Sequence, residues 1–181
     1  MNNLMLFSMI TLFLASCNNQ SSSELQATAV KKGEYLVTVA GCNDCHSPKI
    51  MTDLGPAPDP ARLLSGHPAD EKVAPYDTVA SKNWILFSLS GTSAHGPWGT
   101  SFAANITPDS TGIGSWTEDQ FLNAMQKGDY HGIAGSRKLL PPMPWLTYSK
   151  MTKDDILAIF DYLKSIKAVK NIVPAAIPPG S

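Results

Sequence analysis

Two cysteines and a histidine stand close together early in the chain, as Cys42, Cys45 and His46. The C-x-x-C-H order is typical of c-type haem attachment, in which both thiols bond to the vinyl groups and the imidazole binds the iron. A redox disulfide would be expected within a βαβ pattern, whereas the residues before Cys42 have a helical pattern. A zinc site would need a second ligand pair, and the sequence has no second C-x-x-C and no H-x-x-x-H. The motif therefore predicts one covalently bound haem c, with His46 as an axial ligand.

A methionine enclosed by prolines is the best candidate for the second axial ligand. Met143 stands between Pro142 and Pro144. Proline fixes its own φ and restricts the residue before it, so we expect Met143 on a stiff, extended backbone. A thioether is a weak ligand, and holding it in place beforehand reduces the entropy lost on binding. The alternative is a methionine that fills a gap in the core. Weaker candidates for the ligand are Met51, Met125, Met151, His67, His95 and His131. We expect His67 and His95 to be exposed loop residues.

The first of three predicted helices leads into the cysteine motif. It runs from about Thr28 to Gly41, with apolar side chains on one face and charged ones on the other. Gly33 lies in its middle, where glycine costs about 1 kcal/mol relative to alanine. We therefore expect another helix to approach this position closely.

Two further helices are predicted towards the C-terminus. One begins at the capping box formed by Thr117 and Gln120 and ends at Gly128. The other begins at Thr152 and carries apolar side chains at helical spacing as far as Ile166.

Loops are predicted between these helices. Six prolines punctuate residues 48–75, which predicts an extended loop that wraps one side of the haem. The carbonyl of Pro56 or Pro58 is expected to accept the Nδ1 proton of His46 and so fix its tautomer. Apolar and turn-forming residues over 84–106 predict one short β-hairpin.

The N-terminal residues are typical of a targeting segment. Residues 1–16 contain an apolar run over 4–14, shorter than the about 20 residues that span a bilayer but suited to a signal peptide. The letters LASC, which end at Cys17, resemble the bacterial lipobox, so we expect cleavage before Cys17 and lipid on its thiol. The alternative is an ordinary secretory signal followed by a free, oxidisable thiol. The polar residues that follow make 17–26 a lipidated cysteine with a flexible tether.

The composition limits the classes of partner. The net charge of the 181 residues is −1, charged residues make up 16%, and no run of one sign occurs. This argues against nucleic acid as a partner. The length allows one compact domain plus a targeting segment. The three cysteines are all explained by the two motifs, so none is left for a structural disulfide.

The order of these features resembles class I cytochrome c over most of the chain. Gly33 and Tyr35 resemble that family's first-helix signature, and Tyr162 resembles its aromatic partner in the last helix. The resemblance implies an all-α cytochrome c fold over residues 27–173, with long haem-wrapping loops and one short β-hairpin. A Pro-rich tail would follow over 174–181.

Two stretches carry a narrower resemblance. NITPDSTGIGSWTEDQF (105–121) and PPMPW (141–145) are similar to the cytochrome subunits of membrane-bound alcohol and sugar dehydrogenases. That resemblance implies that Asn105 and Trp116 line the haem edge.

The ligand set predicts the task. With both His46 and Met143 bound, the iron has no open position, so we expect an electron carrier and not an enzyme. It would be lipid-anchored in the bacterial envelope and face the periplasm. It would transfer electrons between a dehydrogenase or quinol-oxidising complex and another cytochrome or terminal oxidase, by weak docking. The alternatives are a peroxidase-like haem enzyme or gas sensor, and a non-catalytic haem subunit of a dehydrogenase. Distal candidates for the former are His95, His131 and Arg137.

Overall fold

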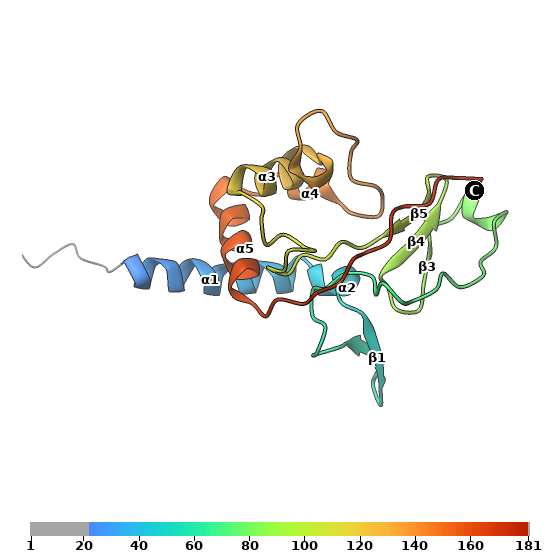
Figure 1. The fold of residues 1–181 in the computed structure, drawn as a ribbon, viewed down its shortest axis with the longest axis horizontal. Coiled ribbons are helices and arrows are strands. Elements are labelled where there is room, and N and C mark those ends of the chain that lie inside the picture. The colour runs from blue at the N-terminus through green and yellow to red at the C-terminus, as the bar shows by residue number, and fades with distance from the viewer. Residues whose placement is uncertain (1–21, 181) are drawn as a thin grey trace, which may run out of the picture.

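The computed structural model describes residues 22–180 (Figure 1), so the predicted lipid-bearing Cys17 lies outside the described residues. The helices are α1 (Ser22–Val39), α2 (Cys42–His46), α3 (Glu118–Leu122), α4 (Trp145–Tyr148) and α5 (Lys153–Ser165). The strands are β1 (Lys49–Thr52), β2 (Gly55–Pro58), β3 (Leu86–Phe87), β4 (Ser93–Gly96) and β5 (Gly99–Phe102). Further helical turns are η1 (Ala80–Lys82), η2 (Asn123–Lys127) and η3 (Tyr130–Gly132), of which η2 is π-helical.

Helices α1 and α5 pack against each other, as Figure 1 shows on the left of the molecule. A Cβ on Gly33 would overlap the backbone of Ala158 and lie 2.8 Å from the Cβ of Tyr162. An ion pair between Lys32 Nζ and Asp155 Oδ1, at 2.6 Å, joins the same two helices. The predicted close approach at Gly33 is therefore confirmed, and α5 is the helix that makes it.

The main core lies where α1, α3 and α5 meet. Its buried apolar side chains are Val37, Leu64, Ile113, Phe121, Leu122, Met125, Ile156, Ile159, Phe160 and Leu163. Helix α3 is fixed by the predicted capping box, in which Gln120 N donates to Thr117 Oγ1 at 3.2 Å and Thr117 N donates to Gln120 Oε1 at 2.9 Å. Phe121 and Leu122 on this helix are buried in the core.

Two small antiparallel sheets lie outside this core. Strands β1 and β2 form a hairpin in which Lys49 pairs with Pro58. The second sheet has the order β3-β4-β5, with His95 of β4 paired with Thr100 of β5. Ile177 pairs with Thr100, so the predicted tail runs back along the outer edge of β5.

The all-α prediction is wrong. The structure is 35% helical and 13% strand, with two sheets. The Pro-rich residues 48–75, predicted to be wholly loop, contain the β1–β2 hairpin, and residues 84–106 contain three strands instead of one hairpin. Strands of two to four residues are too short to show a period-2 pattern, and Pro56 and Pro58 are tolerated because β2 is an edge strand.

The first helix begins earlier than predicted. Helix α1 starts at Ser22, so residues 22–26, expected to be flexible tether, are helical. Among residues 22–180, none of the helices is both long and apolar enough to cross a membrane.

Candidate functional site

Helix α2 brings the motif residues onto one short element. Cys42, Cys45 and His46 all lie within its five residues, and both thiols are free. Gly41 precedes the helix with φ 69 and ψ 28, a left-handed conformation that residues with a Cβ rarely adopt. This glycine turns the chain from α1 into α2, as the sequence predicted.

A lysine holds the end of this helix. Lys49 Nζ donates hydrogen bonds to the carbonyl oxygens of Asn43 at 3.0 Å, Asp44 at 2.9 Å and Ser47 at 2.6 Å. Burial lowers the pKa of Lys49, and the charge of Asp44 opposes that shift. The ammonium group therefore satisfies carbonyls that the end of a helix leaves without partners.

The ring of His46 is oriented by a distant carbonyl. Its Nδ1 lies 2.7 Å from the carbonyl oxygen of Ala104, and because a carbonyl only accepts, Nδ1 carries the proton. The prediction that the carbonyl of Pro56 or Pro58 accepts this proton is wrong, because the carbonyl of Ala104 does so. Both prolines lie in strand β2. Burial lowers the pKa of His46, and the bond to Ala104 only partly opposes this. The ring is therefore neutral at physiological pH, with its lone pair on Nε2.

The two thiols are not activated. Burial raises the pKa of the Cys42 thiol to about 11. Burial and the charge of Asp44 also raise the pKa of Cys45. Redox-active C-x-x-C pairs have a lowered thiol pKa, because the thiolate is the reactive form. Protonated, partly accessible thiols do not match a thiolate nucleophile.

Met143 and Cys42 both contact the main core. Both side chains are half-buried and pack against the same buried cluster. Met143 lies between two turns: Met143 N donates to Leu140 O at 3.3 Å, and Trp145 N donates to Met143 O at 2.9 Å. Helix α4 follows directly, and its Tyr148 hydroxyl donates to Ala40 O at 2.7 Å. The methionine segment is thereby tied to the residues just before the cysteine motif.

The competing methionines occupy different surroundings. Met125 is buried in the core, as expected for a packing residue, and Met51 on β1 is 69% exposed. Met151 is half-buried against the core, like Met143.

The spare histidines His67 and His95 are buried, which corrects the prediction that they are exposed. They are only 1% and 4% exposed. His67 Nδ1 bonds Thr92 Oγ1 and His95 Nδ1 bonds Thr100 Oγ1, each at 2.8 Å. The ring of His67 also packs against Phe102 of β5, with centroids 4.6 Å apart, and the ring of His95 stacks on Tyr76, with centroids 3.9 Å apart.

The remaining distal candidates both contact Tyr130, and the ring centroid of His131 also lies 6.0 Å from that of Trp116. The ring centroids of His131 and Tyr130 are 4.1 Å apart, and the guanidinium of Arg137 lies 3.6 Å from the Tyr130 ring centroid. Within residues 22–180, no group of three or more His, Cys, Asp or Glu side chains is arranged to hold a metal ion.

Trp116 and Asn105, both expected at the haem edge, have different surroundings. Trp116 is half-buried and packs against the core. Asn105 is buried, and its amide binds protein groups: Oδ1 accepts from Thr107 N at 3.0 Å, and Nδ2 donates to Val169 O at 2.8 Å. Asn105 follows Ala104 directly, so it anchors the backbone that orients His46.

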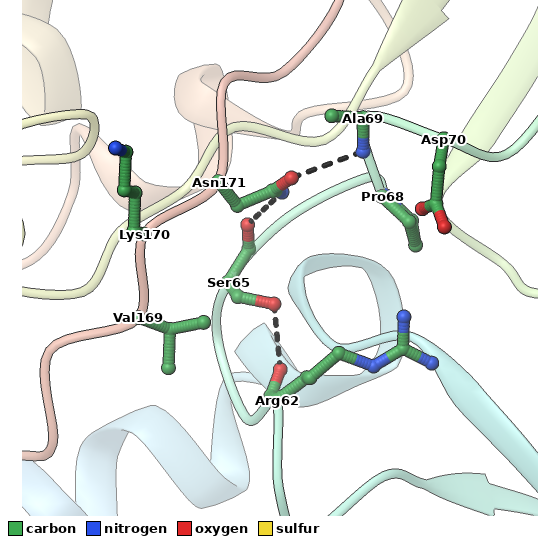
Figure 2. Close-up of a pocket in the computed structure, with 8 residues that line it drawn as sticks. All are labelled: Arg62, Ser65, Pro68, Ala69, Asp70, Val169, Lys170 and Asn171. Atoms are coloured by element: carbon green, nitrogen blue, oxygen red, sulfur yellow. Dashed lines mark hydrogen bonds between the residues drawn. The ribbon is translucent and has the colours of Figure 1, made fainter.

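Sequence reasoning missed three contributors to this site. Ala104 takes part through its backbone carbonyl, which every residue has, so its residue type gives no signal. Lys49 follows the motif but has no characteristic pattern. Asn171 joins the C-terminal segment to the loop after Arg62, where a pocket of about 270 Å³ opens (Figure 2). A half-buried asparagine that binds several backbone groups can be recognised only once the fold brings those groups together.

The comparisons with known proteins point in one direction. No protein-family model matches the chain. It is 29% identical to the gluconate 2-dehydrogenase cytochrome c subunit of Pantoea cypripedii over 152 residues, which cover 83% of this chain and 25% of that protein. It is 40% identical to the alcohol dehydrogenase (quinone) cytochrome c subunit of Gluconacetobacter polyoxogenes over 90 residues, 49% of this chain and 17% of that protein.

A third relative agrees with these two. The fructose dehydrogenase cytochrome subunit of Gluconobacter japonicus is 35% identical over 79 residues, 42% of this chain and 15% of that protein. The chain thus spans about a quarter or less of the length of these relatives. Its homologues are cytochrome c subunits of dehydrogenases, and the similarity to them is modest.

Proposed function

We propose that this chain binds one haem c covalently and transfers electrons. The observation that carries the proposal is the state of His46, whose Nδ1 proton is held by Ala104 O at 2.7 Å and whose Nε2 keeps its lone pair. Two protonated thiols stand on the same helix, at the spacing that thioether attachment requires. The names of the relatives support the same function.

Each residue has a distinct part in this proposal. Cys42 and Cys45 would form the thioether bonds, His46 would be one axial ligand, and Met143 the other. Trp116 would pack at the haem edge. A bound haem would supply a reversible one-electron iron couple. The protein would keep His46 neutral and oriented and would exclude water through the core that Cys42 and Met143 both contact. With two protein ligands, the site would carry electrons and would not bind a substrate at the metal.

Covalent haem attachment is tested with the three cysteines of the chain. The protein is produced in cells that contain a c-type cytochrome maturation system, and haem is followed on denaturing gels and by mass. Wild type and Cys17→Ser should retain one haem, whereas Cys42→Ala/Cys45→Ala should lose it. Retention of covalent haem by the double variant would overturn the proposal.

We further propose that the domain is anchored by lipid on Cys17 and faces the periplasm. The support is the lipobox-like sequence before Cys17. The partners would be a dehydrogenase or quinol-oxidising complex on one side and another cytochrome or terminal oxidase on the other, in keeping with the dehydrogenase names of the relatives. Cys17→Ser should move the protein from the membrane to the soluble fraction. A variant that stays with the membrane would contradict the anchor.

A further inference from the structure

The segment after α5 binds a loop that touches His46. Asn171 Nδ2 donates to Ser65 O at 2.7 Å and to His67 O at 2.8 Å, and its Oδ1 accepts from Ala69 N at 3.0 Å. Figure 2 shows the Asn171 amide between Ser65 and Ala69. One side chain therefore fixes three backbone groups of this loop, which come from residues 65–69.

That loop is in turn bonded to the backbone of His46. Gly66 N donates to His46 O at 2.7 Å, and the two carbonyls bound by Asn171 belong to the residues on either side of Gly66. Gly66 has φ +78, and a Cβ there would lie 2.5 Å from the carbonyl carbon of Ala104. His67 N also donates to Ala103 O at 2.9 Å. The loop is thus pressed against the backbone that supplies the acceptor for the His46 ring.

The same C-terminal segment binds the other side of the acceptor. Asn105 Nδ2 donates to Val169 O at 2.8 Å, and Val169 N donates to Thr107 Oγ1 at 3.1 Å. Asn171 N donates to Thr111 Oγ1 at 2.9 Å. Residues 169–171 therefore connect the loop that contacts the His46 backbone to the segment that contacts its ring.

From this arrangement we infer that Asn171 is a positioning residue, which holds the carbonyl of Ala104 against the Nδ1 proton of His46 and so sets the reduction potential. The inference rests on the proposed haem function. A strong hydrogen bond at Nδ1 makes the imidazole a better electron donor, which favours the ferric iron and lowers the potential. Removing the bonds of Asn171 should therefore weaken the hydrogen bond between His46 Nδ1 and Ala104 O and raise the reduction potential.

The test compares two variants with a matched control in the haem-loaded protein. Asn171→Ala removes all three side-chain bonds. Thr111→Val leaves that side chain in place but removes the acceptor for Asn171 N, together with the bonds of the same hydroxyl to Asn105 Nδ2 and Asp109 Oδ1. Ile172→Ala is the control, because this neighbour is 68% exposed. We measure the reduction potential by redox titration and the exchange of the His46 Nδ1 proton with deuterium by NMR.

Asn171→Ala should raise the potential and speed exchange of the Nδ1 proton, while the absorption spectrum shows that both axial ligands remain. Thr111→Val should raise the potential and the exchange rate by a smaller amount. This variant tests the inference if Asn171→Ala does not fold. An unchanged potential and exchange rate, or a fall in potential caused by water entry, would overturn the inference even if melting temperature drops. Wild type that binds no haem would overturn the proposed function itself, which is a separate outcome.

Discussion

The Nδ1 of His46 and the carbonyl oxygen of Ala104 lie 2.7 Å apart although 58 residues separate them in the chain. Helix α2 places His46 beside Cys42 and Cys45, but the helix does not orient the imidazole ring. The orientation comes from a loop, which is itself held by the segment after the last helix. The local motif and the long-range fold therefore contribute different parts of one site: the motif supplies the donor atoms, and the fold sets their direction.

The lysine at the end of α2 gives a first prediction. Lys49→Met keeps most of the aliphatic side chain but removes the donor to three carbonyls. Hydrogen bonds from a charged donor contribute about 1.5–3 kcal/mol when they are buried, and this site is only half-buried, so we expect a loss of about 1–3 kcal/mol in the free energy of unfolding. Urea denaturation measures it. Lys72→Met, at an exposed position, is the control and should change stability little. Equal effects of the two substitutions would contradict this role of Lys49.

Gly33, at the crossing of α1 and α5, gives a second prediction, in which helix propensity and packing change the stability in opposite directions. In an isolated helix, Gly33→Ala would gain about 1 kcal/mol from helix propensity. Here the new methyl group would overlap the backbone of Ala158, which cannot rotate away. Overpacking costs about 1–3 kcal/mol, and an overlap with backbone atoms belongs at the upper end of that range. After the propensity gain is subtracted, we expect a net loss of about 2 kcal/mol in the free energy of unfolding. Lys31→Ala, exposed on the same helix, serves as the control. A stabilised Gly33→Ala would mean that α1 and α5 are farther apart.

The sequence was sufficient wherever a signal was local. The capping box at Thr117 and the start of α5 at Thr152 depend on residues three apart, and both are present in the structure. Gly33 was informative because its helix propensity conflicts with its position, and that conflict indicated a close partner. The turn at Gly41 followed in the same way from the need for a positive φ.

The sequence was insufficient wherever pairing was long-range. The strands β3, β4 and β5 are each two to four residues long, so their pairing with one another and with Ile177 decides that they exist. The burial of His95 depends on that sheet and on the loop before it, because His95 pairs with Thr100 and its ring stacks on Tyr76 with centroids 3.9 Å apart. Pro56 and Pro58 lie in the loop that follows His46 in sequence, so the sequence alone predicts a proline carbonyl as the acceptor. A backbone carbonyl carries no residue-type signal, so Ala104 could be found only from the fold.

Buried His67 gives a prediction of pH dependence. Burial lowers its pKa below the usual 6.5, and the charge of Glu71 only partly opposes this. The unfolded chain therefore takes up the proton first as the pH falls. The stability due to the neutral ring is complete above pH 6.5 and is lost as the pH falls through the folded-state pKa. His67→Asn should reduce the slope of unfolding free energy against pH in this acid window, measured by urea denaturation.

Part of that slope should remain in the variant, because burial also lowers the pKa of His95 and of His131. His131→Asn is a useful comparison, since His131 lies in a different part of the structure, beside Tyr130. If His67→Asn leaves the slope unchanged, the ring of His67 is already able to accept a proton in the folded protein.

Met143 gives the prediction on which the electron-carrier function depends most. Met143 stands just before helix α4, whose Tyr148 hydroxyl donates to Ala40 O beside the cysteine motif, and its side chain packs on the same core as Cys42. In the haem-loaded protein, Met143→Ala should abolish the methionine-to-iron charge-transfer band of the ferric form while the covalent haem remains. The open position should then bind carbon monoxide rapidly in the ferrous form, which wild type should not do. Met151→Ala is the matched control, because Met151 is also half-buried against this core. A band that survives in Met143→Ala but disappears in Met151→Ala would move the ligand to Met151, and rapid carbon monoxide binding by wild type would favour a gas-binding or catalytic haem instead.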